Sequence, residues 1–98
     1  MNEKNNHEKK EQMKQELFQL LASISEPETI SNLLDDLCTY KEIEQMAERL
    51  TAARLLIEGK TYNQVMEQTE ISSATLSRVS RCVQYGKGYS NLLKRNDS

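Results

Sequence analysis

Hydroxyl and cationic side chains recur at helical spacing in the last third of this 98-residue chain. At about 100° per residue, a helix here would place Ala74, Ser77, Arg78, Arg81 and Tyr85 on one face. Arginine matches the acceptor edges of phosphate and guanine, serine hydroxyls reach either, and a small residue lets a helix approach a base closely. This face favours nucleic-acid binding. The plain alternative is the solvated, serine-rich side of a helical hairpin.

Residues suited to other chemistries lack partners. The sequence has one histidine, His7, in a polar segment, and two cysteines, Cys38 and Cys82, without the spacing of a metal site or a disulfide framework. Asp35 and Asp36 are adjacent, so on a helix their carboxylates diverge and do not form a catalytic pair. Phosphate-binding loops, dinucleotide fingerprints and nucleophile elbows are absent from the sequence. The sequence therefore predicts no enzyme activity, no metal and no cofactor.

Two short helices joined by a tight turn are predicted to position the polar face. Gly59 suits the end of a preceding helix, because glycine enters the left-handed region without a steric penalty. Thr61 and Gln64 have the spacing of a capping box at the start of the next helix. Ile71 falls in the turn, where it can fill the angle between the helices, and Ser72 is a good N-cap for the second helix. The pattern predicts a helix-turn-helix.

The second of these helices, Ser73–Gln84, is the predicted recognition helix. Leu76, Val79 and Val83 lie on its inward side, and the opposite side is predicted to enter the major groove of double-stranded DNA. The predicted DNA-contacting residues occupy the helix starts and this outer side: Thr61, Ser72, Ser73, Ala74, Thr75, Ser77, Arg78 and Arg81.

Charge is distributed unevenly along the chain. The formal net charge is −2, yet residues 1–70 contain 8 Lys+Arg and 14 Asp+Glu, whereas residues 71–98 contain 5 and 1. The basic excess begins where the recognition helix begins. Because local potential attracts phosphate more than total charge does, the distribution supports the nucleic-acid interpretation.

The first part of the chain predicts further helices. Residues 1–9 are polar and are predicted to be a disordered tail or a frayed helix start. Apolar residues then recur at helical spacing from Met13 to Ile24. Ser25 and Glu28 have capping-box spacing and predict the start of a second helix.

A third and longest helix is predicted over residues 40–58, with Ile43, Met46, Ala47, Leu50, Ala53 and Ile57 as its buried stripe. Tyr89 is predicted to dock on the core in a last helical turn. Residues 10–98 are predicted to form a single domain with a modest core, so a partner chain is expected to cover the first apolar stripe. No apolar run approaches a membrane span and no signal peptide is evident, which predicts a cytoplasmic protein.

A resemblance to the Trp repressor family covers LLDDLCTYKEIEQMAERLTAARLLIEGKTYNQVMEQTEISSATLSRVSR, residues 33–81. More closely, residues 15–93 look like the YerC/YecD branch of Trp repressor-like proteins. The resemblance implies an all-α bundle with a helix-turn-helix. It implies an intertwined homodimer whose two recognition helices enter successive major grooves. It also implies sequence-specific regulation of bacterial transcription, usually repression.

The resemblance also implies an effector pocket. In the Trp repressor, two arginines and groups at the start of the central helix hold the amino-acid corepressor, and the matching residues here are Thr39, Arg49 and Arg78. Val79, however, stands where the Trp repressor has glycine beside the bound indole, and its side chain should fill that space. A small-molecule corepressor is therefore not favoured, and tryptophan is not expected to bind.

Two functions remain open from the sequence. One is a DNA-binding regulator, and the other is a helical protein-interaction module that uses a helix-turn-helix as a scaffold. The arginine-bearing, serine-rich face favours DNA, since a partner surface more often exposes aromatic or methionine anchors.

Overall fold

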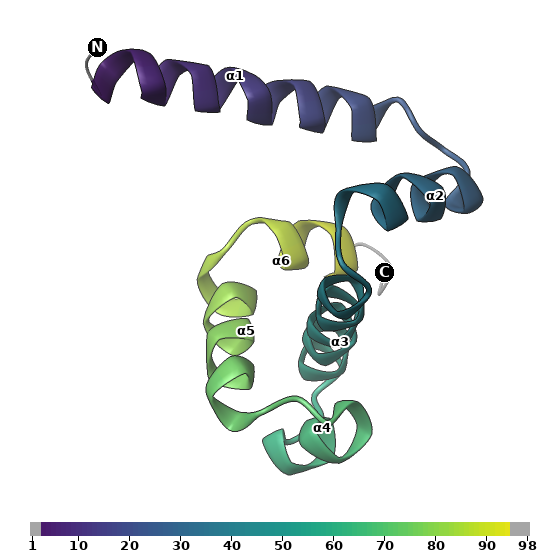
Figure 1. Ribbon diagram of the computed structural model, residues 1–98. Helices are drawn as coiled ribbons and strands as arrows, with labels where there is room; N and C mark the ends of the chain where they lie inside the picture. Colours follow the sequence, from purple (N-terminus) through teal and green to yellow (C-terminus); the bar gives the residue numbers. More distant parts are fainter. Residues whose placement is uncertain (1–2, 95–98) are drawn as a thin grey trace. The chain divides into compact units, whose positions relative to one another are not determined.

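The structure is a computed structural model that describes residues 3–94. These residues form α-helices and no strand, which confirms the predicted all-α class (Figure 1). The helices are α1 Glu3–Ala22, α2 Pro27–Leu37, α3 Tyr40–Ile57, α4 Tyr62–Thr69, α5 Ser73–Tyr85 and α6 Gly88–Leu93. Contacts divide the chain into two compact units, Met1–Thr39 and Tyr40–Ser98. The prediction of a single domain over residues 10–98 stays a prediction.

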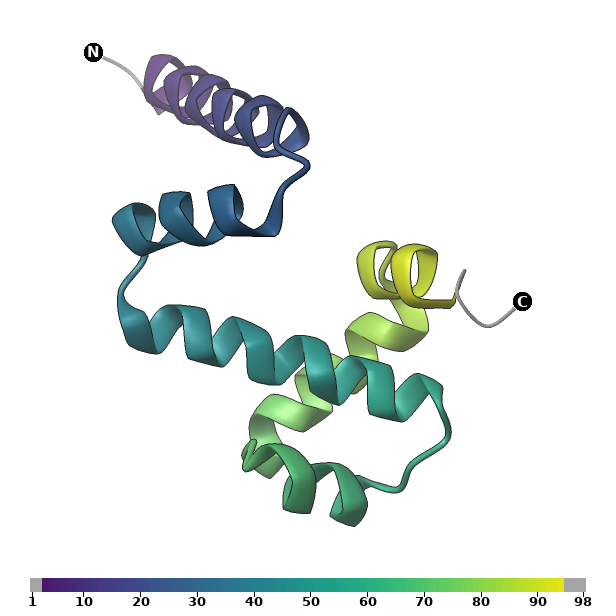
Figure 2. The ribbon, with the colours of Figure 1, turned by 90° about the vertical axis from the view of Figure 1, so that its right-hand side faces the viewer.

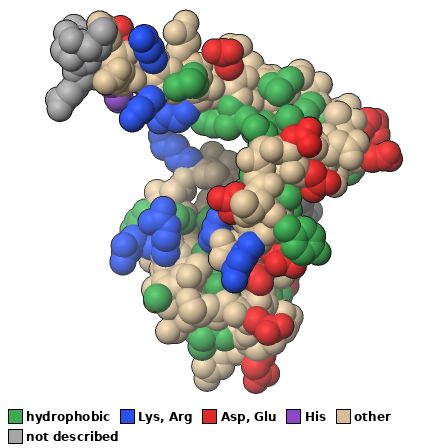
Figure 3. All heavy atoms as spheres, viewed as in Figure 1, with side chains coloured by type: hydrophobic (Ala, Val, Ile, Leu, Met, Phe, Trp, Pro, Cys, Tyr) green, Lys and Arg blue, Asp and Glu red, His purple; other side chains and the backbone are tan. Residues whose placement is uncertain are grey.

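The first unit contains α1 and α2 and has no buried residue between positions 5 and 39. Hydrophobic side chains line part of α1 (Figure 3). Met13 and Phe18 are 60% and 51% exposed, and Leu20 is exposed as well. Within one copy of the chain, this unit lacks a core that could repay the entropy of ordering it.

Two local predictions for the first unit concern where its helices begin. α1 begins at Glu3, so residues 3–9 are helical, which favours the helix-start alternative over a disordered tail. Their Glu and Lys residues are good helix formers, and the helix continues without a break into the apolar stripe. The predicted Ser25–Glu28 capping box is wrong, because Pro27 occupies the first helical position and Glu26 is the N-cap, without a side-chain cap bond.

The second unit contains a small core between α3, α4, α5 and α6. α3 packs on all three of the other helices, and α4 and α6 lie toward opposite ends of α5 (Figures 1 and 2). The buried apolar side chains come from three of these helices and the α4–α5 turn: Ala52, Ala53, Val65, Ile71, Leu76 and Val79. Tyr89 and Leu93 of α6 pack against this core, which confirms the predicted docking of Tyr89.

The predicted buried stripe of α3 is only partly correct. Of that stripe, Ala53 is fully buried, whereas Met46 and Leu50 are 38% and 42% exposed. The fully buried pair is Ala52 and Ala53, because α4 and α5 pack where α3 has small side chains. The apolar side chains nearer the start of α3 are left accessible on this unit.

None of the helices in the described part of the chain is both long and apolar enough to cross a bilayer.

Candidate nucleic-acid interface

The first helix of the motif, α4, begins at a reciprocal cap. The Thr61 hydroxyl accepts from the Gln64 backbone N–H at 3.2 Å, and the Gln64 side-chain oxygen accepts from the Thr61 N–H at 2.9 Å. Gly59, just upstream, has a φ of 97°, which glycine adopts without strain. Both predictions are confirmed, so the start of α4 is fixed by its own sequence.

The turn between α4 and α5 is held by three residues. The Thr69 hydroxyl donates to the Val65 carbonyl at 2.7 Å and accepts from the Ile71 N–H at 3.3 Å. Glu70 lies in the left-handed region, with φ 61° and ψ 17°. Ile71 is 7% exposed and belongs to the core, as predicted. The angle between the two helices is therefore set by a hydrogen-bonded and packed turn.

The second helix, α5, is fixed by its cap and by its inner side. Ser72 is the N-cap, and its hydroxyl accepts from the Thr75 N–H at 3.2 Å. Leu76 and Val79 are 0% and 1% exposed, and Val83 packs against the core. The predicted inward side is confirmed, and it determines which side chains the helix presents outward.

The outer side of α5 is accessible over its whole length. Ser73, Ala74, Ser77, Arg78 and Arg81 are all exposed. Neither arginine forms an ion pair among residues 3–94. Basic side chains gather over the end of α5 that adjoins α6 (Figure 3). The structure thus brings five of the eight predicted DNA-contacting residues onto one exposed side of α5.

The other three predicted residues have local roles that involve their hydroxyls. Thr61 is engaged in the α4 cap, and the hydroxyls of Ser72 and Thr75 lie 3.0 Å apart in a mutual hydrogen bond. Thr61 and Ser72 are exposed, whereas Thr75 is half-buried. These side chains lie at the starts of the two helices, where those of Thr61 and Ser72 satisfy backbone donors.

Metal-ligating side chains are dispersed. No group of three or more His, Cys, Asp or Glu residues in the described part of the chain is placed to hold a metal ion.

The comparisons with known proteins agree with this arrangement. The family model of the Trp repressor protein matches residues 7–97. The chain belongs to the Trp repressor family. It is 45% identical over 71 residues to the uncharacterized protein YerC of Bacillus subtilis strain 168, a match that covers 72% of this chain and 68% of that protein. The resemblance seen in the sequence, including its YerC branch, is confirmed.

Solved structures support the same family fold. A TrpR-like protein from Eubacterium eligens matches with a TM-score of 0.83 and 34% identity, over 88% of this chain and 90% of that one. A Trp repressor candidate from Staphylococcus aureus matches with a TM-score of 0.79 and 34% identity, over 85% and 84% of the two chains. Trp repressor family membership identifies the α4–α5 pair as the helix-turn-helix of a regulator.

The effector pocket of Thr39, Arg49 and Arg78 that the Trp repressor resemblance implies stays a prediction. Arg49 lines a polar pocket of 260 Å³ between α3 and the turn, and Arg78 does not line it. Thr39 belongs to the first unit of the chain. The other lining residues come from α3 and from the turn and first residues of α5: Gln45, Glu48, Glu70, Ile71, Ser72 and Thr75.

Val79 occupies the core side of α5. At 1% exposure its side chain is among the largest that are fully buried. The space next to α5 at this position is therefore filled by the protein itself.

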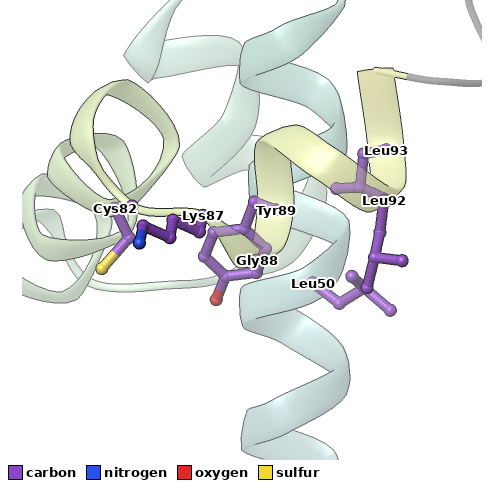
Figure 4. Close-up of a pocket in the computed structure, with 8 residues that line it drawn as sticks. Leu50, Cys82, Lys87, Gly88, Tyr89, Leu92 and Leu93 are labelled. Atoms are coloured by element: carbon purple, nitrogen blue, oxygen red, sulfur yellow. The ribbon is translucent and has the colours of Figure 1, made fainter.

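A larger apolar depression was not predicted. It measures 640 Å³ and lies between α3, α6 and the end of α5, with Leu50, Tyr89 and Leu92 among its lining residues (Figure 4). Leu50 and Leu92 point toward one another there, from α3 and α6. The sequence signal for this depression is the apolar triplet Tyr89, Leu92 and Leu93, of which only Tyr89 was assigned a place, in the core.

Proposed function

We propose that this Trp repressor family protein is a sequence-specific, DNA-binding transcriptional regulator that acts as a homodimer and represses transcription in the bacterial cytoplasm. The recognition helix α5 lies in the major groove, and the DNA-contacting set is the eight residues named from the sequence. The observation that supports the proposal is the two-sided character of α5. Leu76 and Val79 anchor it, while Ser77, Arg78 and Arg81 are exposed on the other side.

The charge of the exposed side suits a polyanion. Arg78 and Arg81 are three residues apart, so both lie on the same side of the helix. Neither arginine has an ion-pair partner in the described part of the chain. A DNA phosphate or guanine could therefore bind either guanidinium group without displacing a carboxylate of the protein. The partial positive charge at the start of α5 adds to the attraction.

The homodimer rests on apolar surface that one chain leaves uncovered. In the first unit, Met13, Phe18 and Leu20 are exposed. In the second unit, the apolar depression exposes Leu50 and 66% of Leu92. Burying such surface contributes about 25 cal/mol per Å², so we infer that α1 of one copy packs into this depression of the other. Two recognition helices related by a two-fold axis would then meet two half-sites.

Sedimentation of the full chain at micromolar concentration tests the dimer. Leu20→Asp should shift the protein toward monomer or aggregate, because the substitution places a charge in the inferred contact. Gln19→Asp is the matched control on the neighbouring, polar position, and it should remain dimeric. A well-folded monomer from the unmodified chain would refute the arrangement.

Selection of binding sites from a random DNA pool, followed by salt titration, tests DNA readout. The unmodified protein should enrich a two-fold symmetric sequence, and its affinity should fall steeply as salt rises.

Arg78→Ala and Arg81→Ala should each weaken DNA binding. If the side chain contacts a guanine, the loss should be about 1–3 kcal/mol and should fall on the preferred sequence. If it contacts a phosphate, affinity should fall evenly across sequences and should depend less steeply on salt. Arg54→Ala, an exposed arginine in the last turn of α3, is the control and should bind normally. Unchanged affinity in both α5 variants would show that DNA binds elsewhere.

A helical protein-interaction module is the second candidate, and Tyr85 favours it. This side chain lies at the end of α5, on the side of Arg78 and Arg81, and is 81% exposed. An exposed aromatic residue is a common anchor for a protein partner. Failure to enrich any DNA sequence, together with weak salt dependence, would support this candidate over the regulator.

A further inference from the structure

Four hydroxyl side chains lie within six residues at the start of α5, and they are in two different states. The hydroxyls of Ser72 and Thr75 are hydrogen-bonded to each other, and the Ser72 hydroxyl also accepts from the Thr75 backbone N–H. Ser73 and Ser77 have no side-chain hydrogen bond among residues 3–94, and both are exposed. Sequence alone placed all four in the DNA-contacting set, since residue type does not distinguish them.

The engaged pair has a structural role. The Ser72 hydroxyl accepts from the Thr75 N–H at 3.2 Å, which satisfies one of the backbone donors left open at a helix start. The same oxygen and the Thr75 hydroxyl share a 3.0 Å hydrogen bond. Thr75 is half-buried and borders the polar pocket beneath the turn. Using the Ser72 hydroxyl to contact a base would therefore compete with the cap, and the Thr75 hydroxyl is already bonded to that of Ser72.

The two unengaged hydroxyls are placed for readout. Ser73 and Ser77 are four residues apart, so they lie on one side of the helix and about 6 Å apart along its axis. Ala74 next to Ser73 is small and exposed, and Arg78 follows Ser77. A hydroxyl can donate to or accept from a base edge, and the first residues of a recognition helix are the ones nearest to the bases.

We propose that Ser73 and Ser77 select bases, whereas Ser72 and Thr75 are positioning residues that order the first turn of the recognition helix and contact no base. This inference rests on the proposed DNA-binding function. It divides the hydroxyl residues of the predicted set into two classes with different effects on sequence preference.

Selection of sites from a random DNA pool, repeated with four single variants of the full chain, tests the division. Ser73→Ala and Ser77→Ala should relax the preferred base at one or two positions and lower affinity for the wild-type site by about 2- to 12-fold, the loss of one hydrogen bond. Binding to random DNA should change little. Thermal stability should be unchanged or slightly raised, because alanine is the better helix former.

The two positioning variants should behave in the opposite way. Ser72→Ala should lower the melting temperature by about 4–8 °C for the loss of a cap. Thr75→Val keeps the backbone N–H that bonds the Ser72 hydroxyl, so it should lower the melting temperature less, through loss of the hydrogen bond between the two hydroxyls. Both variants should weaken specific and random DNA equally and leave the selected sequence unchanged. Ser72→Asn should restore the melting temperature and affinity with the original sequence, since asparagine is as good an N-cap as serine.

Two results would overturn the division. One is an altered sequence preference in Thr75→Val or Ser72→Ala, and the other is an unaltered preference in both Ser73→Ala and Ser77→Ala. Failure of the proposed function itself would look different, because the unmodified protein would then enrich no sequence at all.

Discussion

The Ser90 hydroxyl donates a 2.6 Å hydrogen bond to the backbone carbonyl of Val83, and this bond ties α6 to the last turn of α5. The final carbonyls of a helix have no partner within the helix. The Gly86 N–H bonds the carbonyl of Cys82 at 2.8 Å, and Ser90 bonds that of Val83. The short α6 thus completes the end of the recognition helix while Tyr89 packs against the core.

Ser90→Ala should destabilise the fold by about 1 kcal/mol, because it leaves a partly buried carbonyl without its donor. The measurement is urea unfolding followed by circular dichroism. Ser31→Ala, at an exposed position of α2, is the matched control and should change stability by less than about 0.5 kcal/mol. Equal stabilities for the two variants would mean that the Ser90 bond contributes nothing.

Gly86→Ala should destabilise the protein by about 1–3 kcal/mol through overpacking. A Cβ built at Gly86 would lie 2.6 Å from the Cys82 backbone oxygen, so the α5–α6 junction must shift. Gly88→Ala is the control, since a Cβ there meets nothing within 4 Å, and it should be neutral or slightly stabilising. Unfolding curves of both variants compare the two glycines directly, and a neutral Gly86→Ala would contradict the close approach.

The sequence was sufficient for the helix-turn-helix because its signals are local. Thr61, Ser72 and Gly59 act on backbone groups within a few residues, and the structure confirms all three. Ser25 shows the limit of such signals. Its spacing to Glu28 fitted a capping box, but Pro27 fixes its own φ and suits the first helical position, which moves the N-cap to Glu26.

What the sequence could not give depends on contacts between distant residues. Periodicity identified the apolar stripe of α3, but it could not show that α4 and α5 cover Ala52 and Ala53 while Leu50 stays accessible. Residue type likewise could not separate Thr75, which is hydrogen-bonded to Ser72, from the unengaged Ser77. The resemblance to the Trp repressor family supplied the architecture, and the side-chain geometry distinguished the roles.

Glu70→Gly should stabilise the protein by about 0.5–1 kcal/mol. Glu70 has a φ of 61°, and the left-handed region costs a residue with a Cβ roughly 1–2 kcal/mol. Glycine avoids this cost, but it loses more conformational entropy on folding, so the net gain in stability is smaller. Glu67→Gly, in the interior of α4, is the matched control and should destabilise by about 1 kcal/mol. The two variants remove the same side chain three residues apart, so opposite signs in chemical unfolding would isolate the backbone effect. A loss of stability in Glu70→Gly would instead assign a net stabilising role to the carboxylate in the turn.

Tryptophan should not bind to this protein, although it belongs to the Trp repressor family. Val79 is 1% exposed and fills the core side of α5, and Arg78 does not line the polar pocket that Arg49 borders. A site for an indole needs volume as well as charge. Calorimetry at millimolar tryptophan should therefore show no saturable heat, and DNA affinity should not respond to the amino acid.

Val79→Gly would remove the side chain that fills this space, at a cost of about 1 kcal/mol in helix propensity and further loss of core packing. Saturable binding to the unmodified protein, coupled to tighter DNA binding, would make the chain a tryptophan-dependent regulator and overturn this interpretation.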